Sequence, residues 1–428
     1  MTNSRRLAFE TICDVIDKGE YSNILLPRRL RDSSLDSRDR AFATELVYGT
    51  LRAQSKLDFI ISKLSHRAID ELELRVLVVL RLGVFQLIEL RTPPHAAINE
   101  TTELAKQVLG KSTASFIHGI LRNLERQEIQ LPVDDDVDSL AIRFSLPGWI
   151  IRAFSDSLRD SASFLDLLSS QNIPARPVLN ALPGRGSEPE LIASGATKIE
   201  GSARAFTYDG NPGEIEAIRK HSAIVQDLGS QVVVEEFFSA AAHNLSPSPR
   251  WLDLCAGPGG KAAYLDSLIT DGEFVANEIS AIRARLVETV VRRGKVTNVD
   301  GRRLKSELGS FDRILLDAPC TGLGALRRRP EIRWRRSVSD LGPLQQLQRE
   351  LLTSAADALN PGGLIGYATC SPHLIETKLQ IRRFLAENPN FTRVSVSDKY
   401  ADTDGDLQLW THKNGTDSMF LSLLRKTA

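Results

Sequence analysis

The chain has 428 residues, 42% hydrophobic and 25% charged, which is ordinary for a soluble protein of roughly two to four domains. Its formal net charge is +0, so it has no overall basic field, and any nucleic-acid surface must be a local patch. The cysteines, at positions 13, 255, 320 and 370, form no C-x-x-C pair. This excludes a zinc ribbon and a disulfide framework, predicts no metal site, and favours a reducing, cytoplasmic location.

Residues 1–132 are predicted to be entirely helical, because apolar residues recur there at helical spacing and no strand-like alternation intervenes. Residues 72–90 are the most apolar stretch, but charged side chains interrupt it. We therefore expect a buried helix there and no membrane span. Two more helices are expected at 97–108 and 113–126. The N-terminus lacks the apolar core of a secretory signal.

The acidic run 134–138 is a candidate linker, and residues 139–225, rich in Pro and Gly, are expected to form a small α/β connecting subdomain. From residue 226 to 428 short apolar runs alternate with helical segments. Strands are predicted at 251–255, 274–277, 296–299, 313–316 and 364–368, and helices at 261–269, 281–293 and 344–359. This alternation predicts a doubly wound parallel sheet, which binds ligands beyond the carboxyl ends of its strands.

A glycine-rich turn follows the first of these strands and opens a helix; it consists of Cys255, Ala256, Gly257, Pro258, Gly259, Gly260 and Lys261. It fits neither the G-x-G-x-x-G fingerprint nor the P-loop spacing. Glu278 ends the second strand, where it can bind ribose hydroxyls, and Asp300 follows the third, where it can accept from an adenine amino group. A purely structural turn is the alternative, but the two acids favour a nucleoside cofactor without a pyrophosphate.

Two cysteines follow the next two strands. Cys320 lies in Asp317-Ala-Pro-Cys-Thr-Gly322, and Cys370 lies in Thr369-Cys-Ser-Pro372. A lone cysteine is usually a small buried residue. Because the carboxyl ends of parallel strands share one edge, we expect these two thiols to face the same crevice, where a thiolate could act as a nucleophile.

At these motifs, and at 226–231, 311–334 and 361–372, the chain resembles the RNA cytosine-5 methyltransferases of the RsmB type, which act on small-subunit ribosomal RNA. The resemblance implies a Rossmann-like catalytic domain over 226–428 and S-adenosylmethionine bound by the glycine-rich turn, Glu278, Asp300 and Asp317. It also implies that Cys370 attacks cytosine C6 and that Cys320 assists product release. Chemically, the base must also be protonated or hydrogen-bonded at N3, which an acid such as Asp317 can do. A thiolate on C6 makes C5 enamine-like and able to attack a methyl sulfonium.

Segments 45–52, 97–106 and 116–123 resemble the NusB-like RNA-binding domain that is fused to this subtype. The chain departs from the usual motifs at Gly257, where Ala is common, and at Glu278, where Asp is common. After the nucleophile, Ile375-Glu-Thr377 replaces E-E-N. None of these departures removes a catalytic group.

A basic cluster follows the Cys320 motif, and only Glu331 opposes it; its members are Arg327, Arg328, Arg329, Arg333, Trp334, Arg335 and Arg336. Arginine binds phosphates and tryptophan stacks on bases, so the cluster is predicted to contact RNA, although a solvated loop would have the same composition. The expected partner is small-subunit ribosomal RNA, bound by a monomer with no membrane contact.

Two alternative functions remain. The enzyme could methylate transfer RNA or DNA, a reading that the helical domain disfavours. The chain could instead be a non-catalytic RNA-binding or transcription-regulatory protein that keeps the fold as a scaffold. The presence of Lys261, Asp317, Cys320 and Cys370 disfavours that second reading.

Overall fold

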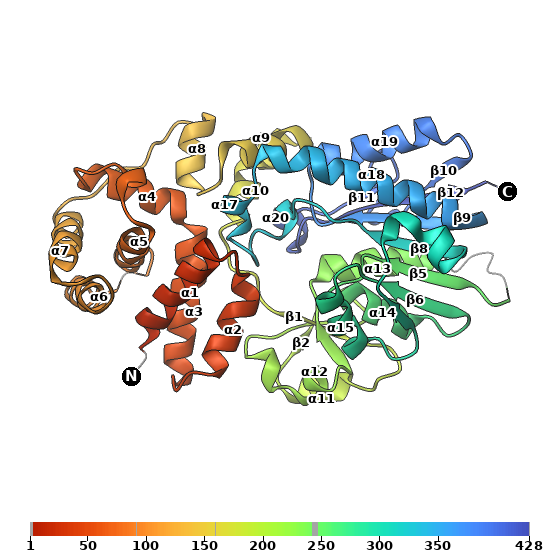
Figure 1. Cartoon of the computed structure of the whole chain (residues 1–428), viewed down its shortest axis with the longest axis horizontal. Coiled ribbons are helices and arrows are strands. Elements are labelled where there is room, and N and C mark those ends of the chain that lie inside the picture. The colour runs from red at the N-terminus through yellow and green to blue at the C-terminus, as the bar shows by residue number, and fades with distance from the viewer. Residues whose placement is uncertain (1–2, 91, 159, 242–246, 428) are drawn as a thin grey trace. The chain divides into compact units, whose positions relative to one another are not determined.

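A computed structural model describes residues 3–90, 92–158, 160–241 and 247–427 (Figure 1). The chain forms two compact units, and each is assembled from separate stretches of sequence. The helical unit contains Met1–Ser155, Ser161–Pro174 and Leu326–Arg336, and the catalytic unit contains Asp156–Asp160, Ala175–Ala325 and Ser337–Ala428. The segment Leu326–Arg336 therefore belongs to the helical unit, although it interrupts the sequence of the catalytic unit.

The first part of the helical unit is built entirely from helices, as predicted. These are α1 (Ser4–Asp17), α2 (Ser22–Arg31), α3 (Ser37–Arg52), α4 (Gln54–Leu64), α5 (Leu74–Ile88), α6 (Pro94–Leu109) and α7 (Lys111–Arg126). The apolar stretch is the central helix α5, which is buried continuously over 76–86. Within the described residues, no helix is long and apolar enough to span a membrane.

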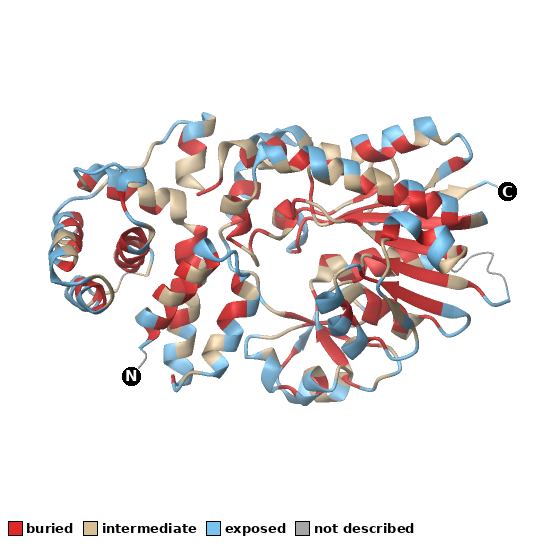
Figure 2. Ribbon diagram, viewed as in Figure 1, coloured by how far each residue is buried: buried red, intermediate tan, exposed pale blue. Residues whose placement is uncertain are grey.

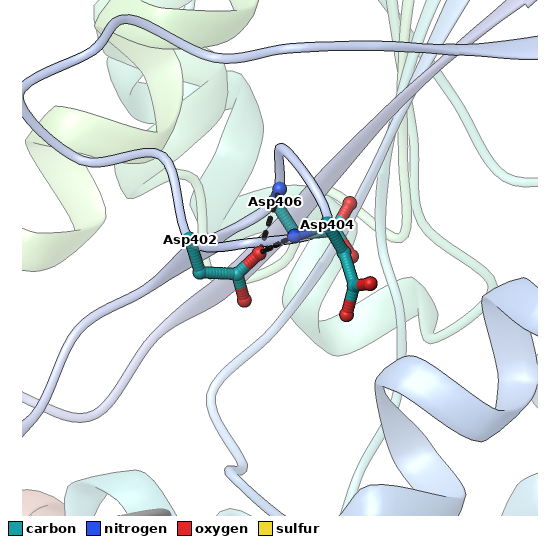
Figure 3. Close-up of side chains that lie close together, drawn as sticks. All are labelled: Asp402, Asp404 and Asp406. Atoms are coloured by element: carbon teal, nitrogen blue, oxygen red, sulfur yellow. Dashed lines mark hydrogen bonds between the residues drawn. The ribbon is translucent and has the colours of Figure 1, made fainter.

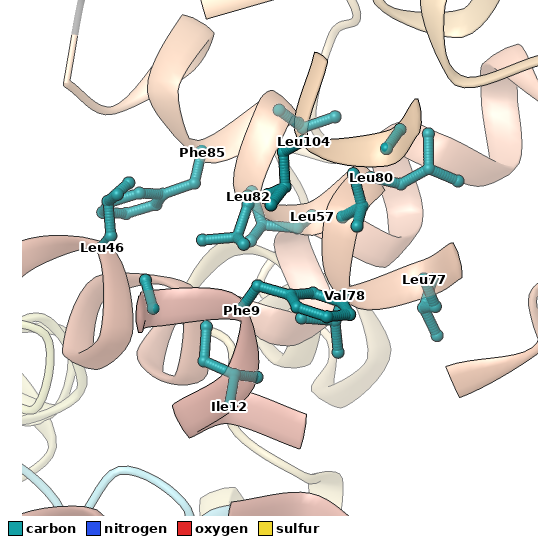
Figure 4. Close-up of a cluster of buried hydrophobic side chains, with 14 of the residues drawn as sticks. Phe9, Ile12, Leu46, Leu57, Leu77, Val78, Leu80, Leu82, Phe85 and Leu104 are labelled. Atoms are coloured by element: carbon teal, nitrogen blue, oxygen red, sulfur yellow. The ribbon is translucent and has the colours of Figure 1, made fainter. Parts of the chain in front are cut away.

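Close packing around α5 explains two glycines. A Cβ atom on Gly49 would lie 2.0 Å from the ring of Phe85, and one on Gly83 would lie 2.8 Å from the Leu121 side chain. Figure 4 shows Phe85 and Leu82 of α5 beside Leu46 of α3 in this core. Side chains interlock at this density throughout protein interiors.

Residues 139–174 differ from the prediction. The described residues among them form no strand of an α/β subdomain but the helices α8 (Val137–Arg143), α9 (Gly148–Ser157) and α10 (Phe164–Ser170), and all of them except residues 156–160 belong to the helical unit. The α/β part begins only at β1 (Val178–Ala181) and belongs to the catalytic unit. Its sheet is antiparallel in the order β2 (Thr197–Lys198), β3 (Ala205–Thr207), β1 and β4 (Ala223–Val225).

The large sheet of the catalytic unit has a parallel core. Its strand order is β10 (Phe391–Val394), β12 (Phe420–Lys426), β9 (Leu359–Thr369), β8 (Phe311–Asp317), β5 (Arg250–Leu254), β6 (Glu273–Asn277) and β7 (Lys295–Thr297), with β11 (Leu407–Gln408) paired to β12. Strands β5 to β9 are parallel, which confirms the predicted doubly wound sheet. The antiparallel strands β10 to β12 were not predicted.

Helices bury both faces of this sheet, as Figure 2 shows in the colouring of its strands. They include α13 (Leu228–Ala241), α14 (Gly260–Leu268), α15 (Ala281–Val290), α18 (Leu341–Ala358) and α19 (Lys378–Glu387). Alternate residues of β5 enter the two cores, Trp251 on one side and Leu252 on the other. The carboxyl ends of β5, β6, β8 and β9 consequently meet at one edge, where the predicted site residues lie.

Candidate active site

The glycine-rich turn is fastened to the end of β6. Its first residue, Cys255, has φ +67° and Gly259 has φ +115°, so the chain reverses sharply before α14 begins at Gly260. The amide of Ala256 donates to Asn277 O at 2.9 Å, and the amide of Gly257 donates to Glu278 Oε2 at 3.0 Å. Burial and nearby carboxylates raise the pKa of Cys255. This thiol is therefore protonated at neutral pH and is no nucleophile.

Glu278 is held by several donors at the end of β6, and only 1% of its surface is exposed. Its Oε1 accepts from the Ser280 amide at 2.8 Å and from Arg283 Nη2 at 2.7 Å. Its Oε2 lies 2.5 Å from the place that a Cβ atom on residue 257 would occupy. A side chain on residue 257 would therefore collide with the Glu278 carboxylate.

Asp300 follows β7 and is turned toward Arg302. Its carboxylate accepts from the Arg302 backbone amide at 3.0 Å and from Arg302 Nη2 at 2.7 Å. These bonds lower the pKa of Asp300 to about 2, so the group is ionised at neutral pH. Arg302 thus already donates to the Asp300 oxygens that were predicted to accept from an adenine amino group.

Asp253 is a site residue that the sequence reading missed. It lies on β5 with 0% exposure, and both of its carboxyl oxygens lack a hydrogen-bond partner among the described residues. Burial, and then the charge of Asp317, raise its pKa well above the ordinary value. Buried polar groups normally have partners, and an exception calls for an explanation such as a ligand. The signal available in the sequence was an acid inside an apolar strand.

Lys261 and Asp317 form an ion pair that joins the glycine-rich turn to the end of β8. Lys261 Nζ donates to Asp317 Oδ2 at 2.8 Å, and the lysine side chain is only 11% exposed. Burial alone would lower the pKa of Lys261, but the negative charges of Asp317, Cys370 and Asp253 outweigh it and raise the pKa. Lys261 therefore carries a positive charge close to the Cys370 thiol.

The two predicted cysteines lie side by side. Cys320 Sγ and Cys370 Sγ are 3.4 Å apart, each just beyond the end of its strand, β8 or β9. The shared hydrogen bond with Cys370 raises the pKa of Cys320, and burial and the negative charges of Cys370 and Glu376 raise it further. In this pair Cys320 keeps its proton and donates it toward Cys370.

Backbone contacts also join the two cysteine loops. The amide of Gly324 donates to Cys370 O at 2.9 Å, and the amide of Ser418 donates to Gly324 O at 3.0 Å. A Cβ atom on Gly324 would lie 2.0 Å from Ser418 O, so only glycine permits this approach. The short distance between the sulfur atoms is thus built into the main chain.

Two parts of the chain match known protein families. Residues 240–425 match the family model described as 16S rRNA methyltransferase RsmB/F, and residues 2–126 match the NusB family. Ribosomal RNA small subunit methyltransferase B of Klebsiella pneumoniae (strain 342) is 32% identical, over 91% of this chain and 90% of its own. A Mycobacterium tuberculosis protein named as a methyltransferase, with no substrate in its name, is 40% identical over 99% of this chain and 96% of its own.

This chain belongs to the RsmB/F family. Among solved structures, PH0851 superposes with a TM-score of 0.83 at 22% identity and covers 99% of this chain and 98% of its own. NSun6 from Pyrococcus horikoshii, solved with SFG, superposes at 0.57 with 17% identity, over 66% of this chain and 98% of its own. At these identities both structures support the fold alone.

As an RsmB/F-family methyltransferase, the protein uses S-adenosylmethionine, and the site fits that cofactor. The orphaned Asp253 carboxyl offers acceptors for an ammonium group. Glu278 and Asp300 follow β6 and β7, where a ribose and a purine would bind, and each already accepts from an arginine, Arg283 or Arg302. The glycine-rich turn allows a ligand to approach the backbone closely.

The arginine-rich segment of this RsmB/F-family protein differs from the prediction. Arg333 is 0% exposed, and it donates to the backbone carbonyls of Arg52, Ser145 and Gln171 inside the helical unit. Trp334 Nε1 donates to Leu51 O at 2.7 Å. The predicted RNA contact of Arg333 is therefore wrong, because carbonyls of the fold already occupy its buried guanidinium group, whereas the contact of the half-buried Trp334 stays a prediction.

The remaining arginines of the cluster also have roles in the fold. Arg335 donates to Val15 O and Glu20 O, and the guanidinium groups of Arg329 and Arg335 lie 5.8 and 5.2 Å from the Tyr21 ring centroid. Arg327 is buried, and Arg328 and Arg336 are half-buried. RNA contacts by members of the cluster other than Arg333 stay a prediction.

A group of three aspartates between β10 and β11 carries no metal assignment. Asp402, Asp404 and Asp406 offer oxygens within 4.8 Å of one another (Figure 3). Lys378 Nζ lies 2.5 Å from Asp402 and 2.9 Å from Asp404, and Arg393 Nε lies 3.2 Å from Asp406. Lys378 and Arg393 thus form ion pairs with these three acids, as in an ordinary charge network.

Proposed function

We propose that this protein methylates carbon 5 of a cytosine in small-subunit ribosomal RNA through a covalent bond between Cys370 Sγ and cytosine C6. The observation that carries the proposal is the pair of sulfur atoms 3.4 Å apart beside the Lys261–Asp317 ion pair. A near-full-length relative named for small-subunit ribosomal RNA supports the substrate. The NusB match over residues 2–126 supports RNA binding by the helical unit.

The charges around the thiols suit this chemistry. The Lys261 ammonium group and a hydrogen bond from the Cys320 thiol both favour the thiolate form of Cys370, which is the form that attacks. We assign to Asp317, in its protonated form, the hydrogen bond donated to cytosine N3, which withdraws electrons from the ring. S-adenosylmethionine supplies an electrophilic methyl group at this point.

The thiolate forms the Sγ–C6 bond, and C5 then bonds to the methyl carbon as that carbon's bond to sulfur breaks, which leaves S-adenosylhomocysteine. A base removes the C5 proton, the C5–C6 double bond re-forms, and Cys370 leaves with the electron pair of the Sγ–C6 bond.

Cys320 is the base that we propose for the last step. While Cys370 is a thiolate, the hydrogen bond between the two sulfurs is the largest cause that raises the pKa of Cys320. Once Cys370 is bonded to C6, that charge and that acceptor are gone. Cys320 then gives its proton to solvent water more readily, and its thiolate can take the proton from C5. A cytosine stacked in a duplex could not reach these groups, so the target base must be extruded or unpaired.

Trapping of the covalent adduct tests both roles. Wild type, Cys370→Ala and Cys320→Ala are incubated with S-adenosylmethionine and small-subunit ribosomal RNA, and methyl transfer and denaturant-stable protein–RNA adducts are measured. We expect methylation by wild type, an accumulating adduct with Cys320→Ala, and neither product with Cys370→Ala. Analysis of the RNA nucleosides must show 5-methylcytosine.

The same assay separates the alternatives. Methylation of transfer RNA in preference to ribosomal RNA would replace the proposed substrate. An adduct in Cys370→Ala but not in Cys320→Ala would reverse the two roles. Binding of total cellular RNA without methylation or adduct in any variant would favour a non-catalytic RNA-binding protein.

A further inference from the structure

Glu376 is a buried acid that none of the proposed chemical steps uses. It ends the short 3-10 turn η7 (Leu374–Glu376) in the loop that follows Cys370, and it is 0% exposed. Its backbone carbonyl accepts from the hydroxyl of Tyr367, on β9, at 2.9 Å. Glu376 is therefore fixed in the strand and loop that carry Cys370. Burying a carboxylate is costly unless hydrogen bonds compensate, so its partners indicate its role.

The carboxylate of Glu376 reaches across to the loop of Cys320. It accepts from the Thr321 amide at 2.8 Å, from the Thr321 hydroxyl, and from Gln348 Nε2 at 3.1 Å. Gln348 Nε2 also donates to Pro319 O at 2.8 Å. Glu376 thus holds the residue after Cys320 directly, and it holds the residue before Cys320 through Gln348.

A second bond returns to the Cys370 loop. The hydroxyls of Thr321 and Ser371 are 3.1 Å apart, and both residues are at most 1% exposed. Ser371 is the immediate neighbour of Cys370. The path from Glu376 through Thr321 to Ser371 therefore connects the two cysteine loops at the point where their sulfur atoms meet.

We propose that Glu376 is a positioning residue that sets the distance between the Cys320 and Cys370 thiols by holding Thr321 and Gln348. The hydrogen bonds of its carboxylate go to Thr321 and Gln348 and not to either sulfur, and its negative charge adds to the causes that raise the pKa of Cys320. Its importance for catalysis rests on the proposed function, but its effect on the thiol spacing does not. Removing its carboxylate leaves the Thr321 amide buried without its acceptor and leaves Gln348 Nε2 with Pro319 O alone, so the Cys320 loop must shift to satisfy the Thr321 amide.

The thiol spacing can be measured without RNA. Dibromobimane becomes fluorescent when it bridges two adjacent thiols, and peptide mass spectrometry identifies a Cys320–Cys370 bridge. In Glu376→Ala we expect the bridging rate to fall about tenfold, the effect of one lost buried hydrogen bond. Glu376→Gln should stay within about threefold of wild type, because its amide oxygen can accept from Thr321 and its NH₂ can donate to the Thr321 hydroxyl.

Matched variants control for general damage. Glu235→Ala removes a half-buried glutamate that accepts from the Tyr264 hydroxyl at 2.7 Å in the same unit, and it should leave the bridging rate unchanged. If Glu376→Ala fails to fold, Thr321→Val, which removes only the hydroxyl between Glu376 and Ser371, serves in its place. Binding of S-adenosylhomocysteine verifies that the cofactor site is intact.

Methyl transfer gives the second readout. We expect Glu376→Ala to lower kcat without raising the KM for RNA and to accumulate the covalent adduct, as Cys320→Ala does, with rescue by Glu376→Gln. A folded Glu376→Ala, or its substitute Thr321→Val, that bridges its thiols at the wild-type rate overturns the proposal. If bridging depends on Glu376 but wild type methylates no cytosine, the positioning role stands and the proposed function fails.

Discussion

Glu278 and Gly257 fit each other in a way that accounts for both departures of the cofactor loop. The Glu278 carboxylate reaches the Gly257 amide at 3.0 Å, and it fills the space in which a side chain on residue 257 would begin. Aspartate is one methylene shorter than glutamate and would leave that space open. The pair of alanine and aspartate that resembling sequences commonly carry is therefore replaced here by a pair of glycine and glutamate.

A double-mutant cycle tests this coupling. Gly257→Ala should weaken S-adenosylhomocysteine binding about tenfold, because the new Cβ would lie 2.5 Å from Glu278 Oε2 and displace the carboxylate. Adding Glu278→Asp should recover most of that loss. Isothermal titration calorimetry of the two single variants and the double variant gives the interaction energy.

Gly342→Ala is the matched control for the cycle, since a Cβ atom there meets nothing within 4 Å. Its affinity for S-adenosylhomocysteine should equal that of wild type. Additive losses in the double variant would show that residues 257 and 278 act independently and would refute the coupling.

Functional residues that lie in short, distinctive motifs could be predicted from the sequence. Cys320 and Cys370 stand in distinctive motifs at strand ends, and the structure brings their sulfurs together. Asp253 and Glu376 could not be predicted as site residues, because their significance depends on being buried. Spacing along the chain does not reveal that Asp253 lacks a partner or that Glu376 bonds to Thr321 in a distant loop.

At the scale of elements, the segment Leu326–Arg336 completes helices of the helical unit. Residue Tyr21, which precedes α2, makes no side-chain capping bond, and Glu331 instead accepts from the Ser22 amide at 3.1 Å and the Ser22 hydroxyl at 2.7 Å. Arg333 instead donates to carbonyls at the C-terminal ends of helices, because Arg52 is the last residue of α3 and Gln171 follows α10. An acid at a helix start and a cation at helix ends both suit the helix dipole.

Replacing Arg333 should therefore loosen the helical unit. Arg333→Met keeps much of the apolar stem but leaves buried carbonyls without a donor, and we expect a loss of about 3 kcal/mol or more. The variant should show a lower thermal midpoint and faster tryptic cleavage within residues 326–336. Arg382→Met, on the exposed surface of α19, is the control, and equal behaviour of the two variants would contradict this role.

The RNA contact of Arg333 was predicted wrongly because a count of charges does not distinguish an exposed arginine from a buried one. Six arginines and one acid in a short run predict a phosphate-binding surface when the chain is read locally. The partners of Arg333 are instead carbonyls of residues 52, 145 and 171, far away in sequence. Parallel strands, by contrast, were predictable because each is a continuous apolar run buried on both faces.

At the scale of the whole molecule, the compact units do not coincide with continuous stretches of sequence. The predicted divisions at 132, 139–225 and 226 follow changes in composition, and they separate residues 139–155, 161–174 and 326–336 from the helical unit to which they belong. Composition reports what a segment is made of, whereas unit membership depends on which distant residues it contacts.

A split protein tests this organisation. The fragment 175–428 carries Leu326–Arg336 without the rest of the helical unit, so Ile332 and the Arg333 guanidinium lose their buried surroundings. We expect this fragment to be poorly soluble when expressed alone and to be recovered as a complex when 1–174 is co-expressed. Introducing Arg333→Met into the fragment should reduce that recovery severalfold. Full solubility of 175–428 on its own would argue against the interdependence.

The placement of Leu326–Arg336 also has a consequence for synthesis on the ribosome. The helical unit begins at the N-terminus, yet the side chains that cap α2 and satisfy the end of α3 are translated only after strand β8 of the other unit. At roughly 5–20 residues per second, translation from Pro174 to Arg336 takes on the order of 10–30 s. Throughout that interval α2 and α3 have been synthesised but lack their hydrogen bonds to Glu331 and Arg333. The unit that is first in sequence is therefore completed only when most of the catalytic core has emerged.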